Sequence, residues 1–269
     1  MRENETVMAH YTLLYAAAFG DNPGLWPLPV ATAPYERWLR AVAAGGQGHY
    51  SSATAELAAV RRDVRDGPLA SLAHSTIASF LRQLGGHSEA RRWDGAALVL
   101  AASEPEATVD ALLGLAADAL GMGRLAASAA LLDRARTTLD ASSGPARLPL
   151  RWQWVAAELA MAKGAGDEAV RRAERARELA AGQPSARHLV KTRVVHAAAL
   201  CSAGRIAEAR SVADDALSAS GALGLIPLRW AAASLLVDIG SESGQADDVT
   251  AIRDECADAV RHAGGVWRR

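Results

Sequence analysis

The sequence predicts an all-α fold, a right-handed α–α superhelix (solenoid) of about six antiparallel helix hairpins. Three observations support this fold class. Half of the 269 residues are apolar, yet only 5% are aromatic, and alanine, the strongest helix former, supplies much of that half. Strand-forming residues never gather in alternating runs, which argues against a sheet. Finally, helix-opening prolines alternate with turn glycines that recur every 37–41 residues, as in arrays whose units bury their apolar faces against their neighbours.

A separate element precedes the repeats. Residues 5–19 place apolar residues at the 3.6-residue spacing of an amphipathic helix. Residues 20–29 interrupt it, because three prolines remove backbone donors and two glycines loosen the chain. We expect residues 1–33 to form a cap or, alternatively, the remaining second helix of an incomplete repeat.

Each repeat begins with a helix-opening proline, and a turn glycine follows 14 to 20 residues later. Proline is favoured at the first helical position because its missing N–H would be unpaired there anyway. The prolines are Pro34, Pro68, Pro105, Pro149, Pro184 and Pro227. The turn glycines are Gly48, Gly85, Gly123, Gly164, Gly204 and Gly244, at steps of 37, 38, 41, 40 and 40 residues.

After each glycine a second helix is predicted to return antiparallel to the first. These second helices should begin near His49, His87, Arg124, Asp167, Arg205 and Gln245. The array is predicted to cover residues 34–263, and residues 264–269 form a C-terminal tail.

Tryptophan marks the first helices of several units. The segments Pro149-Leu-Arg-Trp152 and Pro227-Leu-Arg-Trp230 share four letters, and Pro34-Tyr-Glu-Arg-Trp38 is a looser version. Small or apolar residues follow each of these tryptophans at helical spacing, which predicts one packing face led by the indole. Trp154 must project from another face of its helix, so it is either covered by a neighbouring repeat or exposed on the concave surface.

The turns resemble those of tetratricopeptide-repeat proteins, in which a glycine, an aromatic or aliphatic residue and an alanine lead into the second helix. Gly48-His-Tyr-Ser-Ser-Ala53 and Gly204-Arg-Ile-Ala-Glu-Ala209 match that turn. The resemblance covers about residues 34–263 and is closest to degenerate bacterial repeats. The period exceeds the usual repeat of about 34 residues, so HEAT-like repeats are the alternative architecture.

The resemblance implies that the first helices line a concave groove. Aligning each turn glycine with the family's turn then places eight candidate partner-binding residues there. They are Ser75, Ser79 and Arg82 in the second unit, Arg151, Trp154 and Glu158 in the fourth, Lys191 in the fifth and Asp238 in the sixth. In the fourth unit the tryptophan and glycine alignments differ by about one residue, and both stay open. The basic carboxylate clamp of tetratricopeptide co-chaperones has no counterpart among these residues.

The sequence predicts no catalytic, cofactor or metal site. The seven histidines form no His-x-x-x-His pair, and Cys201 and Cys256 lie in different repeats without metal-ligand spacing. A net charge of −1 argues against a nucleic-acid partner. Without an apolar run of about 18 residues or a signal peptide, we expect a cytoplasmic protein with no membrane association.

Three functions are compatible with such an array. The first is a non-catalytic scaffold or adaptor that binds a protein or peptide partner in the groove. The second is a regulatory sensor for a peptide or small ligand, and the third, least favoured, is an all-α enzyme. A sensor should have a deep, closed groove, a scaffold an open one, and an enzyme a convergent polar cluster in a pocket. A homodimer is compatible with the sequence, and we expect Arg82→Glu and Lys191→Glu to weaken partner binding without unfolding the array.

Overall fold

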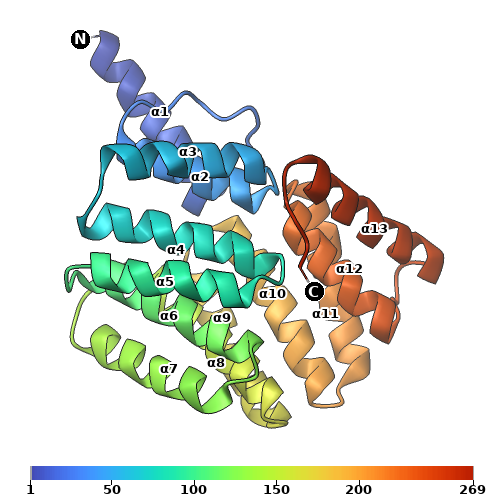
Figure 1. The fold of residues 1–269 in the computed structure, drawn as a ribbon. Coiled ribbons are helices and arrows are strands. Elements are labelled where there is room, and N and C mark those ends of the chain that lie inside the picture. The colour runs from blue at the N-terminus through green and yellow to red at the C-terminus, as the bar shows by residue number, and fades with distance from the viewer. Residues whose placement is uncertain (1, 269) are drawn as a thin grey trace.

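The protein is all-α, as the sequence predicts (Figure 1). The computed structural model describes the backbone of residues 2–268 and the side chains of residues 10–268; Met1 and Arg269, the outer ends of the predicted cap and tail, lie outside the described residues. Within that range there are thirteen helices and no strand. They are α1 (Arg2–Phe19), α2 (Pro34–Gly46), α3 (Tyr50–Asp63), α4 (Gly67–Gln83), α5 (His87–Leu100), α6 (Pro105–Gly121), α7 (Leu125–Asp140), α8 (Arg147–Ala162), α9 (Gly166–Ala181), α10 (Ala186–Ser202), α11 (Ile206–Ala222), α12 (Ile226–Ile239) and α13 (Ala246–His262).

Helices α2–α13 pair into six consecutive hairpins, and the hairpins stack in chain order into a superhelix (Figure 1). Every second helix begins within one residue of its predicted start, and every first helix begins within two residues of its proline. The largest offsets are in α8, which begins at Arg147, and in α10, where the Ser185 hydroxyl accepts a hydrogen bond from the backbone N–H of His188. A side-chain cap of this kind satisfies an otherwise unpaired N–H of the first turn.

Five of the six predicted turn glycines have a positive φ, between 71° and 92°, namely Gly48, Gly85, Gly123, Gly164 and Gly204. The sixth prediction, Gly244, is wrong. Helix α12 ends at Ile239, and Gly240 is the residue with positive φ (84°). The loop that follows is held on α11 by Asp214, which accepts hydrogen bonds from the Ser241 hydroxyl (2.6 Å) and from the backbone N–H of Glu242 (2.8 Å). The last hairpin therefore turns four residues earlier than the sequence rhythm predicts.

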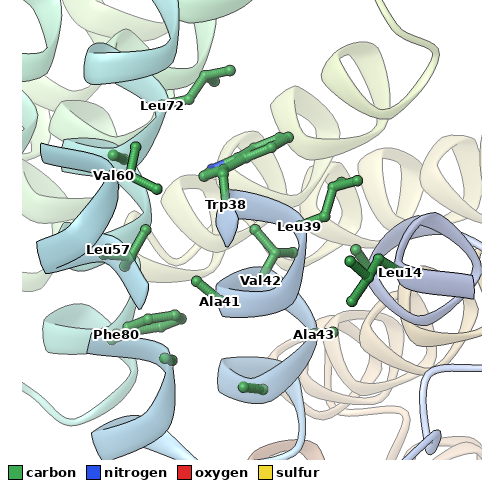
Figure 2. Close-up of a cluster of buried hydrophobic side chains, with 14 of the residues drawn as sticks. Leu14, Trp38, Leu39, Ala41, Val42, Ala43, Leu57, Val60, Leu72 and Phe80 are labelled. Carbon is green, nitrogen blue, oxygen red and sulfur yellow. The ribbon is translucent and has the colours of Figure 1, made fainter. Parts of the chain in front are cut away.

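Small residues allow the hairpins to pack closely, and larger side chains fill the spaces between units. In the first two units, Leu57 and Val60 of α3 and Phe80 of α4 surround the face of α2 that carries Ala41 (Figure 2). Leu14 of α1 covers the opposite side of α2, as Figure 2 also shows. All of these side chains are buried. Their burial is the main source of stability, because removal of apolar surface from water contributes about 25 cal/mol per Å².

The N-terminal helix α1 packs along α2 and also reaches α10, four hairpins further along the array. Of the apolar face predicted for this helix, Leu14 and Ala18 are buried, Tyr11 is exposed, and the side chain of Val7 lies outside the described residues. The loop after α1 continues the same bridge, since the Gly20 carbonyl accepts a hydrogen bond from the Ala186 backbone N–H (3.0 Å). Residues 2–33 thus connect the first and fifth hairpins rather than extending the stack at one end.

The two ends of the array meet. The backbone N–H of Ser51 in α3 donates to the carbonyl of Ala263 (2.8 Å), and the N–H of Arg268 donates to that of Leu84 (2.8 Å). The Arg268 guanidinium also pairs with Glu89 of α5. We call this junction of the last hairpin and tail with the first two hairpins the seam. The predicted tail is therefore part of the fold, and in Figure 1 its red trace lies beside the blue and cyan helices.

Val260 of α13 belongs to the same buried cluster as Leu57 of α3, so the seam also has an apolar component. The superhelix consequently forms a closed ring instead of an open groove. No helix within residues 2–268 combines the length and apolar character that crossing a membrane would require.

Candidate functional site

The ring surrounds a cavity of about 540 Å³ that is partly open to solvent. Its walls come from the first helices of all six hairpins, α2, α4, α6, α8, α10 and α12. Phe19, the last residue of α1, His87, the first residue of α5, and Trp267 of the C-terminal tail complete the lining. The volume lies within the range of about 300–1,000 Å³ that is usual for sites of small organic ligands.

A single register explains which side chains face the cavity. Counting back from the positive-φ glycine of each hairpin, the residues at −13, −10 and −6 lie on one helical face. The −10 residues that line the cavity are Trp38, Ser75, Leu113, Trp154 and Trp230.

Seven of the eight candidate residues predicted from the sequence line this cavity: Ser75, Ser79, Arg82, Arg151, Trp154, Glu158 and Lys191. Asp238 does not. It lies in a smaller adjacent depression with Arg253 and Arg261 of α13. Counting from Gly240 instead of Gly244 moves position −6 from Asp238 to Ser234, but Ser234 lines the same depression as Asp238, so this position of the last unit lies outside the cavity in either count.

The same register decides between the two alignments of the fourth unit. The Trp38 indole N–H donates to the Thr76 hydroxyl of the next first helix, and that of Trp154 donates to Thr192 in the same way, both at 3.0 Å. Trp154 is thus the counterpart of Trp38. The predicted equivalence of Trp152 with Trp230 is wrong, because the Trp152 N–H donates to the Leu132 carbonyl of α7, away from the cavity.

Aromatic rings form much of the cavity wall. The ring of Phe19 lies 5.6 Å from that of Trp38, and Trp230 lies 4.4 Å from Trp267. The Trp154 indole meets the imidazole of His188 edge-on at 5.4 Å. Such rings offer a large apolar surface to a ligand and lose little conformational freedom when one binds.

Arg82 is held by acidic residues behind the wall. One of its Nη atoms donates to Asp94 and to Asp118, both at 2.7 Å, and to the Gly114 carbonyl at 3.2 Å. Both carboxylates are fully buried. Burial raises the pKa of Asp94 to about 7, against the lowering effect of the Arg82 charge. Arg82→Glu would add a third carboxylate to this pair, so the variant would test stability rather than partner binding.

A second charged group lies across the cavity. Arg147 of α8 pairs with Glu106 and Asp110 of α6, and Arg151 also pairs with Asp110. Arg187 of α10 donates from Nη2 to the Ala18 carbonyl at the end of α1 (3.0 Å), and its Nε is buried without a hydrogen-bond partner. Among the described side chains, no carboxylate forms an ion pair with Arg187.

These electrostatic surroundings shift several pKa values. Burial, together with the neighbouring charges of Arg151 and Arg147, lowers the pKa of Arg187 to about 10. Burial and the same arginines hold the pKa of His188 well below its usual range, so its imidazole is neutral. Despite its own burial, Asp110 keeps a lowered pKa because Arg147 and Arg151 stabilise its ionised form.

Sequence reasoning missed Arg147 and Arg187, although a signal was present. Both occupy position −17 relative to their turn glycines, and Glu106 is the −17 residue of the preceding unit. Position −17 is one helical turn before −13 and therefore lies on the same face. Extending the register by one helical turn, to position −17, would have identified Arg147 and Arg187 from the sequence. Phe19 lies outside the repeats and carries no such signal, whereas Trp267, a tryptophan in a terminal segment, was open to docking onto the array or onto a partner.

No protein-family model matches the chain, and the comparison with curated proteins finds no match either. Among the described residues, no group of three or more histidine, cysteine, aspartate or glutamate side chains is arranged to hold a metal ion.

Proposed function

We propose that the chain is a non-catalytic binding module of tetratricopeptide-like hairpins that acts as a regulatory sensor for a small organic molecule or short peptide held in the central cavity. The observation that carries the proposal is the closure of the ring at the seam. Because the ends of the groove meet, the first helices surround a confined, partly open and aromatic-lined cavity of about 540 Å³, which suits a compact ligand better than a long partner segment.

The chemistry of the lining supports binding rather than catalysis. The carboxylate of Asp110 is paired with two arginines and that of Glu158 with Lys191, so neither is free to act as a general acid. The Nδ1 of His188 has no hydrogen-bond partner among the described residues, so it activates no nucleophile there. Polar groups of this kind orient a ligand and discriminate between ligands.

Native mass spectrometry of the chain purified from its host tests the proposal. We expect a bound small molecule or peptide that is released on unfolding. Ser79→Trp, at a half-buried −6 position of the cavity wall, should abolish this ligand by filling the space. Ser52→Trp, on the exposed face of α3, is the matched control and should retain it. A ligand-free wild-type chain whose melting temperature is unaffected by host metabolite extract would contradict the sensor function.

The scaffold hypothesis makes a different prediction for the same variants. A protein partner held on the outside of the ring, or in a ring opened at the seam, would co-purify with the wild-type chain. Retention of one specific protein by both the wild type and Ser79→Trp, with no small ligand in either, would favour the scaffold. Loss of a small ligand from Ser79→Trp alone favours the sensor.

A further inference from the structure

We propose that Arg147, Arg151 and Arg187 form an anion subsite in the cavity, which binds the carboxylate of a ligand whose body is apolar. The inference rests on the proposed function and specifies the ligand class. Its basis is the excess of guanidinium groups over carboxylates in this part of the cavity, together with the aromatic surface beside them.

The charge count is the first step. Three guanidinium groups meet only two carboxylates here, those of Glu106 and Asp110. Both acids are already engaged by Arg147, and Arg151 shares Asp110. One positive charge is left over, and it belongs to Arg187, whose only described hydrogen bond is to the neutral carbonyl of Ala18.

The position of Arg187 is fixed by its surroundings. Its side chain passes Gly46 of α2, where a Cβ would approach the Arg187 Cδ to 2.9 Å, and then reaches the C-terminal end of α1. The helix end offers a partial negative charge, which compensates a full positive charge only in part. A buried guanidinium held in this way, with Nε unpaired, favours a negatively charged ligand group at the cavity surface.

The excess of one charge selects the kind of anion. A monoanionic carboxylate would neutralise this part of the cavity, whereas a dianionic phosphate would leave a net negative charge in a partly desolvated site. The planar fork of an arginine also matches a carboxylate through paired hydrogen bonds.

The walls around the arginines select the rest of the ligand. Phe19 lies against Arg147, with the guanidinium carbon 5.3 Å from the ring centre, and Trp154 lies beside His188. Trp38, Trp230 and Trp267 extend the apolar surface away from the charges. A carboxylate at one end and an apolar body at the other therefore fit the cavity together. A small apolar acid and an apolar peptide with a free C-terminus share this chemistry.

Isothermal titration calorimetry with matched probes tests the subsite. The first pair is octanoate and octanamide, the second is N-acetyl-trileucine as free acid and as C-terminal amide, and octyl phosphate is the dianion. We expect at least one acid to bind about tenfold or more tightly than its own amide and than octyl phosphate. A preference for octanoate over octanamide indicates a small acid as the ligand. A preference for the free acid of N-acetyl-trileucine over its amide indicates a peptide C-terminus.

Variants assign the preference to the arginine. Arg187→Gln should reduce the affinity for the acid by about tenfold to a hundredfold while leaving that for the amide within about threefold. Arg187→Lys keeps the charge and should recover part of the loss. Arg193→Gln, on the exposed face of the same helix, is the matched control and should behave as the wild type. If Arg187→Gln unfolds the ring, Arg151→Gln provides the same comparison.

The outcomes separate this inference from the proposed function. Equal binding of acid and amide would overturn the anion subsite and leave the cavity as a ligand site. Tighter binding of octyl phosphate than of either acid would overturn the choice of a carboxylate. Binding of none of the five probes would also overturn the inference, while a ligand found by native mass spectrometry would still support the sensor.

Discussion

Arg82 and Arg187 have different roles, and their electrostatic contacts distinguish them. Arg82 compensates two fully buried carboxylates behind the cavity wall, so its task is to allow Asp94 and Asp118 to be buried at all. Arg187 lacks a carboxylate partner among the described side chains and faces the cavity. Removing one member of a buried ion pair destabilises a protein by about 3–5 kcal/mol, whereas an unpaired arginine at a cavity surface is available to a ligand. Sequence position alone does not separate the two, because both are arginines in first helices.

The Arg82 cluster predicts a pH dependence of stability. Burial raises the pKa of Asp94 to about 7, far above its ordinary value of 3.8, so the folded chain retains a proton that the unfolded chain releases. Between about pH 4 and pH 7 the unfolded state binds fewer protons, and the free energy of unfolding must fall as pH rises. We expect Asp94→Asn to flatten this decline, because asparagine resembles the protonated carboxyl.

Urea unfolding at pH 5, 6, 7 and 8 measures the effect. Asp140→Asn, in an exposed ion pair of α7, is the control and should follow the wild type. If wild type and Asp94→Asn lose stability in parallel over this range, the proton on Asp94 is not the cause.

At the scale of the helical elements, the position of the turn glycine determines the orientation of the whole first helix. The register counted from Gly85, Gly164 and Gly204 placed seven candidate residues on the cavity wall from the sequence alone. The single failure, Asp238, lies in the last unit, where Gly240 and not Gly244 adopts the positive φ and where both Ser234 and Asp238 line the adjacent depression. The turn glycine thus predicts the cavity-lining candidates in the second, fourth and fifth units but not in the last.

Tertiary contacts limit what such patterns reveal. The identical letters before Trp152 and Trp230 suggested equivalent positions, but the two tryptophans lie 12 and 10 residues before their turn glycines and face different sides. Closure of the ring depends on curvature accumulated over six hairpins and on contacts between residues such as Ser51 and Ala263 that are far apart in sequence. No periodicity within one unit contains that information.

Two glycines inside neighbouring helices provide a prediction about helix packing. Gly114 of α6 and Gly95 of α5 are both mid-helix, where alanine is normally favoured by about 0.5–1 kcal/mol. A Cβ at Gly114 would overlap the carboxylate of Asp94, whereas one at Gly95 would meet nothing within 4 Å. Gly95→Ala should therefore stabilise the chain by about 0.5–1 kcal/mol, and Gly114→Ala should destabilise it by about 2 kcal/mol or more.

Chemical denaturation of both variants measures these changes in the free energy of unfolding. Both carry the same glycine-to-alanine substitution, so a difference between them comes from its position in the fold. Stabilisation by Gly114→Ala would mean that the α5–α6 contact is looser than the Arg82 cluster implies. Destabilisation by Gly95→Ala would contradict the open surroundings of that residue.

At the scale of the whole molecule, the seam joins the two ends of the repeat array, so that the first helices surround the central cavity. Linear arrays couple only neighbouring units, but here α1 joins α2 to α10 and the C-terminal tail joins α13 to α4 and α5. Unfolding should consequently be more cooperative than in an open array. The tail also forms part of the cavity wall, since Trp267 belongs to the lining.

Opening the seam is the last prediction. Trp267 packs on Trp230, and its indole N–H donates to the Ala257 carbonyl (3.2 Å), so it attaches the tail to the last hairpin. Trp267→Ala should lower the free energy of unfolding by about 2 kcal/mol, less than for a fully buried tryptophan, and should weaken ligand retention.

Hydrogen exchange at Ser51 reports the opening directly, because its N–H lies in the first turn of α3 and is bonded only across the seam, to Ala263. We expect faster exchange there in Trp267→Ala and unchanged exchange in Val266→Ala, where an exposed side chain of the same tail is shortened. Unchanged exchange at Ser51 in both variants would mean that the α3–α13 contact holds the ring closed without the tail, and the tail would then cover the cavity without closing the ring.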